Sequence, residues 1–382
     1  MRIGYVDIIV EPDKPGTTGL SDLVWDMAGR LADGPDEVHV VAPYSVTEMP
    51  HPRVLVTRFK LPPIAYQNIA GHILIVLSAL RTLRSLGRFD VIHVPEYLSA
   101  GILSALMPDT PVVLTEPGNI YERVARGNPY DASTTIAYKA AARVAARRCA
   151  GLVATSDEMA RWWGWTGFSP DRITRIPLGI DASLFERIEG ARGIVGMDTE
   201  APIVLYAARL SRENGVDIAL QAFARVVEQL PAARLHILGD GPERQTLEGL
   251  AARLGLSERV TWHGWADMRL LPAYYSATDL FTFSGRSGGT PRVLIQAMAC
   301  GAPVVASAIG GIVDHVEDGR TGLLFSSGDS EAMAERLLTI LADSELRTRL
   351  AKAGQAYSRE QLDWNVLVRR VRSEVYERVA RR

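Results

Sequence analysis

Four glycine-rich turns stand where a hydrophobic run gives way to a helical pattern. They lie at residues 16–19, 239–242, 288–289 and 310–311. Such a turn lets a ligand approach the free N–H groups and positive dipole of a helix N-terminus, which suit an anion. One turn alone is weak evidence, because a tight turn often needs glycine anyway. Four at successive strand ends favour a phosphate-bearing ligand and make these glycines candidate binding residues: Gly16, Gly19, Gly239, Gly241, Gly288, Gly289, Gly310 and Gly311.

Other motifs exclude several kinds of site. No segment matches the G-x-x-x-x-G-K-[ST] pattern of a P-loop, and no strong dinucleotide fingerprint follows the first hydrophobic run. The sequence has no Asp-x-Asp pair and no His/Cys cluster at metal-ligand spacing, so we predict no bound metal. Helix N-termini and cationic side chains must then neutralise an anionic ligand.

Short β-branched runs and helical patterns alternate along the first half of the chain. Alternation at this spacing predicts a doubly wound parallel sheet. The predicted strands are 3–10, 38–42, 54–59, 91–94, 112–115, 152–155 and 173–176. Helices are predicted between most of them, at 20–31, 69–86, 99–107, 134–149 and 158–165.

The alternation stops at a linker-like segment, residues 177–193, and then restarts. The second series predicts strands at 203–207, 235–238, 260–263, 280–283 and 304–306, with helices at 216–229, 243–254, 270–276 and 292–300. A last helical, arginine-rich stretch covers 364–382. Two such sheets predict two α/β domains with a ligand cleft between them.

The composition is that of a globular protein. Of the 382 residues, 47% are hydrophobic and 23% are charged, which is enough for two cores. The formal net charge of −2 gives no electrostatic footprint for DNA or RNA, so we predict no nucleic-acid partner. The two cysteines, Cys149 and Cys300, are far apart, and the first residues lack the apolar region of a signal peptide. We therefore expect a cytoplasmic protein.

The motifs from residue 206 to residue 324 resemble those of glycosyltransferase family 4. Residues 208–215 read Ala-Arg-Leu-Ser-Arg-Glu-Asn-Gly, similar to the family's G-R-L-x-x-E-K-G. Residues 238–244 resemble its G-x-G-P-E-R, and residues 297–306 resemble its E-A-M-A-C-G-x-P-V-V-A, read from the first alanine. Further matches, weaker in the first half, extend the resemblance over nearly the whole chain, at 89–93, 177–181, 310–312, 318–319 and 322–324.

The resemblance implies a GT-B fold, in which two Rossmann-like domains with doubly wound parallel sheets face a cleft. It implies an N-terminal acceptor domain at 1–182, joined by a C-terminal helix at 363–382, and a donor domain at 183–362. It also implies retaining transfer of a sugar from a nucleotide-diphosphate sugar to a hydroxyl acceptor, without a metal. No cofactor is then expected beyond this co-substrate.

The resemblance assigns roles to individual residues. Arg209 matches the arginine that binds and stabilises the donor diphosphate, and the turns at 16–19 and 310–311 would add backbone N–H groups. Gln296 matches the second position of the family's E-x7-E motif and would hold the donor ribose. Gly288 matches the first position and, with Gly289, would lie against the sugar phosphate.

Several of these positions depart from the family pattern. Asn214 stands in place of the E-K-G lysine, Gln296 and Gly288 in place of the two glutamates, and Pro117 in place of a T-x-H histidine. A lost charge-assisted hydrogen bond is worth about 1.5–3 kcal/mol, or roughly 10- to 100-fold in rate. Three arginines could supply the missing positive charge: Arg212, Arg286 and Arg292. Two carboxylates near the position of the missing histidine, Glu96 and Glu116, are catalytic candidates.

Two accounts of these departures stay open. The site has been rebuilt for another donor or acceptor, or the transfer chemistry is lost and the chain is a non-catalytic accessory or binding protein of a partner transferase. A GT-B epimerase is a third, less favoured account. The sequence names neither the donor sugar nor its base, and the acceptor could be a sugar, a lipid-linked molecule or a small molecule.

Smaller signals have both structural and functional interpretations. The tryptophans at 162, 163 and 165 indicate packing more than an acceptor groove. His93, at a strand end, is either a site residue or a structural hydrogen-bonding group. Basic residues at helical spacing indicate a solvated face more than a phosphorylated-acceptor site or contact with an anionic membrane, and they are Lys139, Arg143, Arg147 and Arg148. The apolar run 69–80, followed by Arg81 and Arg84, indicates core packing more than peripheral membrane contact.

Overall fold

A computed structural model of the chain describes residues 1–7, 19–43, 51–60, 69–116, 132–197, 200–287 and 289–381. For residues 19–22, 69–70, 116 and 132–138 only the backbone is described. The chain divides into two compact units, Met1–Leu178 with Trp364–Arg382 and Gly179–Asp363.

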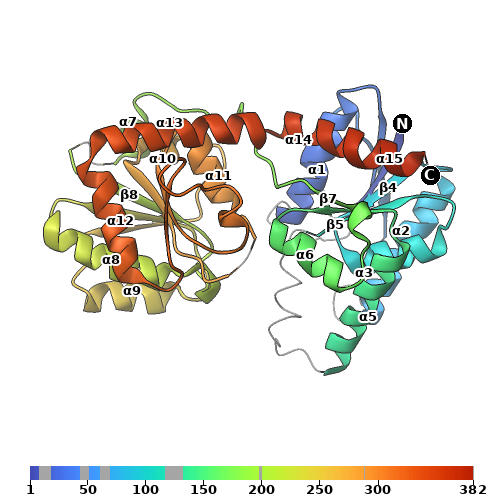
Figure 1. Ribbon diagram of the computed structural model, residues 1–382, viewed down its shortest axis with the longest axis horizontal. Helices are drawn as coiled ribbons and strands as arrows, with labels where there is room; N and C mark the ends of the chain where they lie inside the picture. Colours follow the sequence, from blue (N-terminus) through green and yellow to red (C-terminus); the bar gives the residue numbers. More distant parts are fainter. Residues whose placement is uncertain are drawn as a thin grey trace. The chain divides into compact units, whose positions relative to one another are not determined.

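The first unit is built on a parallel sheet (Figure 1), which has seven strands within the described ranges. The strand order β3-β2-β1-β4-β5-β6-β7 reverses between β1 and β4, as a doubly wound sheet requires. The strands are β1 (Arg2–Val6), β2 (Glu37–Pro43), β3 (Leu55–Phe59), β4 (Val91–Val94), β5 (Val112–Glu116), β6 (Gly151–Ala154) and β7 (Ile173–Arg175). Each corresponds to a predicted strand, so the predicted sheet is confirmed.

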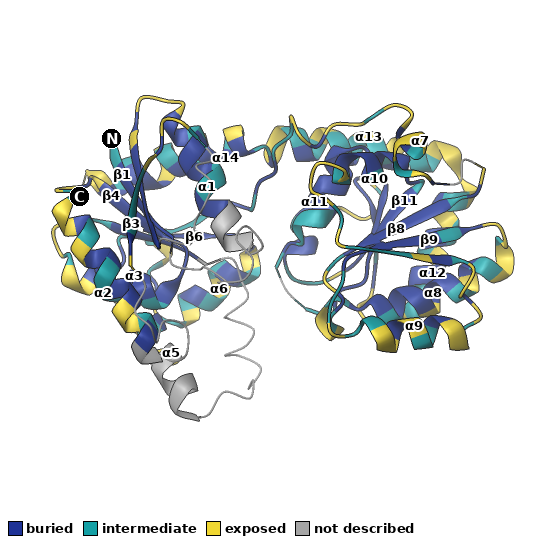
Figure 2. Ribbon diagram, turned by 180° about the vertical axis from the view of Figure 1, so that it is seen from behind, coloured by how far each residue is buried: buried dark blue, intermediate teal, exposed yellow. Residues whose placement is uncertain are grey.

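Helices cover both faces of this sheet because its β-branched strands are buried from both sides (Figure 2). One core packs beneath α2 (Ile69–Ser85), α3 (Tyr97–Leu106), α5 (Ala132–Arg148) and α6 (Asp157–Trp165). The other packs beneath α1 (Gly19–Ala32), α14 (Trp364–Arg370), the π-helical turn η4 (Val371–Tyr376) and α15 (Glu377–Ala380). A short turn, η1 (Pro170–Arg172), precedes β7. The end of the chain is therefore part of the first unit.

A buried hydrogen-bond network joins η4 to the sheet. The Tyr376 hydroxyl bonds both the Tyr5 hydroxyl and His93 Nδ1, while His93 Nε2 bonds the Thr115 hydroxyl. Burial lowers the pKa of His93 to about 3, so its imidazole is neutral. Of the two interpretations of His93, the structural one holds, because both of its ring nitrogens are used inside the core.

The second unit has a second parallel sheet, with the order β10-β9-β8-β11-β12-β13. Its strands are β8 (Ile203–Ala207), β9 (Arg234–Leu238), β10 (Val260–Gly264), β11 (Leu280–Phe283), β12 (Val304–Ser307) and β13 (Leu323–Phe325). Its helices and turns are α7 (Ala191–Val195), η2 (Arg212–Asn214), α8 (Val216–Gln229), α9 (Arg244–Arg253), α10 (Leu271–Ala277), α11 (Arg292–Ala299), η3 (Gly310–Ile312), α12 (Ser330–Ala342) and α13 (Ser344–Gln361). The two doubly wound sheets confirm the predicted fold class.

Six described elements of the second unit were not predicted, among them the turns η2 and η3 and the short helix α7, which begins inside the segment predicted as a linker. Strand β13 has only three residues, too few to show a period, and it is recognised by its pairing with β12. Helices α12 and α13 each begin after an aspartate whose carboxylate accepts two backbone N–H groups, Asp329 and Asp343. Among the described helices, none is long and apolar enough to cross a membrane.

Candidate active site

The candidate site lies at the carboxyl edge of the second sheet, where strand order reverses beside β8. Strand β8 lies between β9 and β11, so the loops after β8 and β11 diverge to opposite sides. In open α/β sheets this point is where ligands bind. The loop after β8 carries Arg209 and Asn214, and the loop after β11 carries Arg286 and Gly289.

Arg209 presents an exposed guanidinium from a turn that is fixed at its backbone. Its carbonyl accepts hydrogen bonds from Asn214 Nδ2 (2.7 Å) and from Ser211 N (2.9 Å). Asn214 is itself held, because the buried Tyr206 hydroxyl donates to its carbonyl. In the part of the chain that is described, the Arg209 side chain has no ion pair or hydrogen bond. It is therefore an uncompensated cation on a turn whose backbone is fixed.

Asn214 positions this turn and brings no charge. The predicted donor-binding residue uses its amide nitrogen on the Arg209 carbonyl, 2.7 Å away. An amide that replaces a lysine removes one positive charge from the site, and here it stabilises the loop that presents the remaining arginine.

Arg286 does not supply the missing charge. Its guanidinium forms a two-pronged ion pair with Asp217 on α8, at 2.7 and 2.6 Å, and it also donates to the Arg212 carbonyl. Burial would raise the pKa of Asp217, but the hydrogen bonds from Arg286 outweigh it and hold that pKa below its ordinary value. The pair is neutral as a unit and joins the loop after β11 to the start of α8.

Gly239 and Gly241 permit a close approach to protein backbone. A Cβ atom on Gly239, whose φ is 121°, would overlap the Ala208 carbonyl oxygen, and one on Gly241 would overlap that of Leu210. The Leu210 N–H donates to the Asp240 carbonyl at 3.0 Å, which fastens the two loops together. Close packing against the neighbouring loop thus explains why both positions are glycine. Their contact with a donor stays a prediction.

Thr290 and Gly311 join the loop after β11 to the turn after β12. The Thr290 hydroxyl donates to the Gly311 carbonyl at 3.0 Å, and a Cβ on Gly311 would collide with Thr290. Gly310 adopts a φ of 41° in the turn η3. Gly288 lies outside the described residues, so the prediction for it has no structural counterpart here.

Gln296 is buried within α11. Its Oε1 accepts a hydrogen bond from the Tyr275 hydroxyl on α10 at 3.1 Å, and 6% of the residue is exposed. Among the described residues its Nε2 has no recorded partner. Tyr275 was missed by the sequence analysis, because nothing in the chain order indicates that it meets Gln296.

Glu96 serves as the N-cap of α3. Its carboxylate accepts from the backbone N–H groups of Leu98 and Ser99 and from the Ser99 hydroxyl. His72 Nε2 on α2 lies 3.3 Å from the same carboxylate, a neighbour that sequence reasoning missed. Burial opposes ionisation, but the His72 and Ser99 hydrogen bonds outweigh it and keep the pKa of Glu96 low. This structural use of the carboxylate leaves the proposed catalytic role without support from geometry.

The other predictions for the first unit fall at or beyond the described residues. Gly16 and Pro117 lie outside them, Gly19 is the first residue of α1, and Glu116 ends β5 with its side chain not described.

Trp163 is buried, with its ring against Tyr97, Trp162 and Phe168, so packing is confirmed for this tryptophan.

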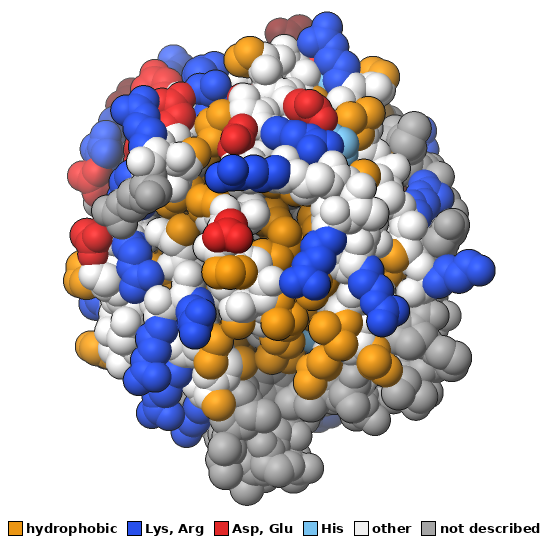
Figure 3. Space-filling view, turned by 90° about the vertical axis from the view of Figure 1, so that its right-hand side faces the viewer, with side chains coloured by type: hydrophobic (Ala, Val, Ile, Leu, Met, Phe, Trp, Pro, Cys, Tyr) orange, Lys and Arg blue, Asp and Glu red, His pale blue; other side chains and the backbone are white. Residues whose placement is uncertain are grey.

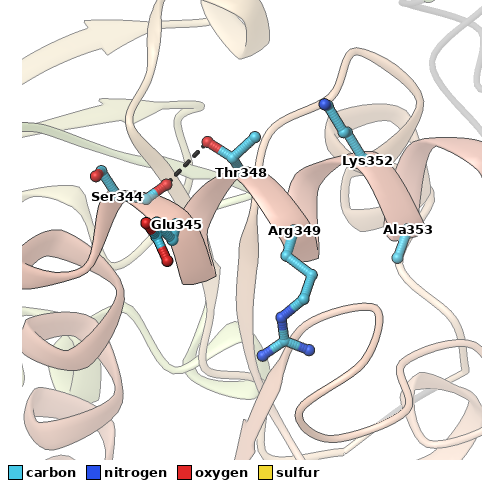
Figure 4. Close-up of a pocket in the computed structure, with 6 residues that line it drawn as sticks. All are labelled: Ser344, Glu345, Thr348, Arg349, Lys352 and Ala353. Carbon is cyan, nitrogen blue, oxygen red and sulfur yellow. Dashed lines mark hydrogen bonds between the residues drawn. The ribbon is translucent and has the colours of Figure 1, made fainter.

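Two hollows are found in the second unit. One of about 390 Å³ adjoins the Arg209 turn and is lined by Ser211, Arg212, Val216, Asp217, Gln221, Glu243, Thr246, Leu247, Leu250 and Arg253. The other, about 760 Å³, is an open depression along one side of α13 (Figure 4), where Thr348 donates to the Ser344 carbonyl. No predicted site residue lines the second hollow.

Comparison with known families agrees with this geometry. Residues 188–357 match the family of group 1 glycosyl transferases, and residues 17–184 match glycosyltransferase family 4. Together the two matches include most of the chain. The chain belongs to glycosyltransferase family 4. It is a glycosyltransferase, so the predicted family and the predicted enzyme class are both confirmed.

Full-length relatives of this glycosyltransferase are found among bacteria. D-inositol 3-phosphate glycosyltransferase of Xylanimonas cellulosilytica is 28% identical over 94% of this chain and 92% of its own. Phosphatidyl-myo-inositol mannosyltransferase of Mycobacterium leprae is 28% identical over 100% of this chain and 97% of its own.

Solved structures share the fold. Sucrose-phosphate synthase from Thermosynechococcus elongatus superposes with a TM-score of 0.82 at 23% identity, over the whole of both chains. Anabaena HepE, solved in complex with UDP and glucose, has a TM-score of 0.80 at 22% identity, over 99% of this chain and 100% of its own.

Proposed function

We propose that this glycosyltransferase moves a sugar from a nucleotide-diphosphate sugar to a hydroxyl acceptor with retention at the anomeric carbon and without a metal. The donor would bind at the carboxyl edge of the second sheet. The single observation that carries the proposal is the exposed, unpaired guanidinium of Arg209, on a turn whose backbone Asn214 holds at the switch point. A cation at this point suits a leaving diphosphate.

Arg286 is excluded as the partner of a diphosphate because Asp217 neutralises it. The exposed cations that remain on the loop after β8 are Arg209 and Arg212, neither of which has an ion pair among the described residues. A guanidinium on this turn can stabilise the charge that develops as the leaving group departs. Removing one such donor typically costs about 2.7–4 kcal/mol of transition-state stabilisation.

The transfer step balances without a protein nucleophile. The bond from the sugar C1 to the diphosphate oxygen breaks, and the acceptor oxygen forms a bond to C1 on the same face. The negative charge that develops on the departing phosphate would pair with Arg209, and the acceptor proton then passes to the departing phosphate oxygen. Such a step needs neither the missing histidine nor the first glutamate, which fits the departures at 117 and 288.

The donor and acceptor classes are supported by proteins that resemble the chain. Anabaena HepE was solved with UDP-glucose, and relatives are named for D-inositol 3-phosphate and phosphatidyl-myo-inositol. A phosphorylated or lipid-linked polyol is therefore the acceptor to test first. The metal-free mechanism, the absence of a cofactor and a cytoplasmic location remain parts of the proposal. A partner transferase belongs to the alternative, in which the chain is a non-catalytic accessory protein.

Product analysis tests the proposal. The chain is incubated with UDP-, GDP- and ADP-sugars in EDTA, with D-inositol 3-phosphate or phosphatidylinositol as acceptor, and the anomeric proton of the product is followed by NMR. We expect one donor to be consumed with its anomeric configuration kept. An inverted product, or turnover that requires a divalent metal, would overturn the mechanism. Nucleotide binding without turnover of any acceptor would favour the non-catalytic binding protein.

A further inference from the structure

Three neighbouring helices of the first unit, α2, α3 and α5, contain no acidic residue, and two of them, α2 and α5, carry basic residues. Helix α3 contacts both α2 and α5, and the buried side chains of all three share one core. Their sequences contain no Asp or Glu, whereas the other described helices of nine or more residues, α1, α6, α8, α9, α12 and α13, each contain at least one. The basic residues are Arg81, Arg84, Lys139, Arg143, Arg147 and Arg148. We call the outer side of these helices the α2–α3–α5 surface.

The positive charges of this surface are not compensated. In the described part of the chain none of its six basic residues forms an ion pair, and Arg84 donates only to the Leu106 carbonyl at 2.8 Å. Lys139, Arg143 and Arg147 are exposed at four-residue spacing, so they form one stripe along α5. In a chain with a formal net charge of −2, this concentration of positive charge is a local feature.

The opposite face of the same sheet is arranged differently. On the C-terminal segment Arg370 pairs with Glu374, and Arg372 pairs with both Asp36 and Glu377. Cations and anions alternate there, which is typical of a face that meets only water. The contrast shows that an arginine-rich composition alone does not produce the α2–α3–α5 surface.

Aliphatic side chains are exposed among these cations. Ile73 and Leu74 on α2, Leu106 on α3 and Val144 on α5 are each about 40% exposed, and Val144 directly follows Arg143. In Figure 3 the lower half of the view, where Figure 1 has α3 and α5, shows blue and orange side chains and no red ones among those described. Aliphatic groups interspersed with cations are the pattern of a surface that lies on a bilayer.

We propose that the α2–α3–α5 surface docks the enzyme on an anionic lipid bilayer. The cations would lie at the headgroups, and the aliphatic side chains would enter the boundary with the acyl chains. A nucleic acid is the less suitable polyanion, since the apolar side chains described as exposed here are aliphatic and cannot stack on bases. The proposal concerns where the enzyme works, so it stands apart from the choice of donor.

Co-sedimentation of the full chain with vesicles tests this docking. Vesicles of phosphatidylcholine alone are compared with vesicles that contain about one third phosphatidylglycerol, at low and at 0.5 M salt. We expect binding to the anionic vesicles only, and a steep loss with salt. In K139Q/R143Q/R147Q, each lost charge should weaken binding about fivefold, and the three together roughly 100-fold.

A matched variant separates the surface from the overall charge. R253Q/R347Q/K352Q removes three basic residues from α9 and α13 of the second unit, and its binding should stay within twofold of the wild type. Equal losses in the two triple variants, both folded by circular dichroism, would overturn the assignment to α2 and α5.

The aliphatic contribution has its own test. I73S/L74S leaves every charge in place and should retain low-salt binding while it loses the part that survives 0.5 M salt. Heparin and duplex RNA serve as competitors for the wild-type chain. If these competitors bind the chain more tightly than anionic vesicles do, the surface is a polyanion site and the membrane proposal fails. The proposal also fails if anionic vesicles bind no more of the chain than vesicles of phosphatidylcholine alone.

Discussion

At the scale of single residues, the neutral pair of Arg286 and Asp217 determines how the candidate site is built. The ion pair neutralises the Arg286 guanidinium and links the loop after β11 to the start of α8. About one third of each side chain remains exposed. Substituting Asp217 with Ala should release the Arg286 guanidinium and loosen the loop after β11.

We expect D217A to lower the free energy of unfolding by about 1 kcal/mol, the upper range for a partly exposed pair. R286K, which keeps the charge but cannot form the two-pronged contact, should lose a similar amount. Urea unfolding of both variants measures this. A variant that unfolds at the wild-type urea concentration would show that the pair does not hold the loops.

Position 239 requires glycine both for its backbone conformation and for its surroundings. We expect G239A to cost at least 3 kcal/mol, since the new Cβ adds an overlap with the Ala208 carbonyl to the strain of a positive φ. Gly255 is the matched control. Its φ is 71° but nothing lies within 4 Å of its Cβ position, so G255A should cost only about 1 kcal/mol. Equal losses, by thermal unfolding, would contradict the close approach of the two loops.

At the scale of elements, helix α3 depends on the ionised carboxylate of Glu96. Because its folded-state pKa lies below the ordinary value of 4.5, Glu96 stabilises the fold above that pH, and this contribution is lost as pH falls through the lower folded-state pKa. E96Q should therefore unfold more easily at pH 7, by about 1–2 kcal/mol.

The difference between E96Q and the wild type should shrink below pH 4.5. Denaturant unfolding at pH 7, 5 and 3.5 checks this dependence, with S99A as a control that removes one donor and keeps the carboxylate. A constant difference across the range would mean that the ionised form of Glu96 is not what caps the helix.

Most elements could be predicted from the sequence, but their contacts could not. Runs of buried β-branched residues are local signals, so every predicted strand is present, whereas β13 depends on pairing with β12. The glycine turns at 239–242 and 310–311 are present, but only the fold shows that Gly239 and Gly241 face the carbonyls of the neighbouring loop. Glu96 was chosen for its charge, and its use as a cap became visible only with α3 in place.

At the scale of the whole molecule, the end of the chain completes the unit that contains its beginning. Tyr376 bonds to Tyr5 and His93 in the interior of the first unit, so we expect Y376F to destabilise that unit by about 1–2 kcal/mol. Y357F removes a comparable bond, to His315, in the second unit. Hydrogen exchange resolved by peptide should show faster opening of β1 and β4 in the first variant only. Faster exchange of β8 and β9 in Y376F would contradict the division into two units.

The most direct test of the account is calorimetric titration of the full chain with UDP, GDP, ADP and TDP in the absence of metal. We predict micromolar binding of one nucleotide, a loss of about 100-fold in R209A, and unchanged binding in R225A, which removes a guanidinium from the far end of α8. Wild-type affinity in R209A, or no binding across the four nucleotides, would contradict a donor site built around Arg209.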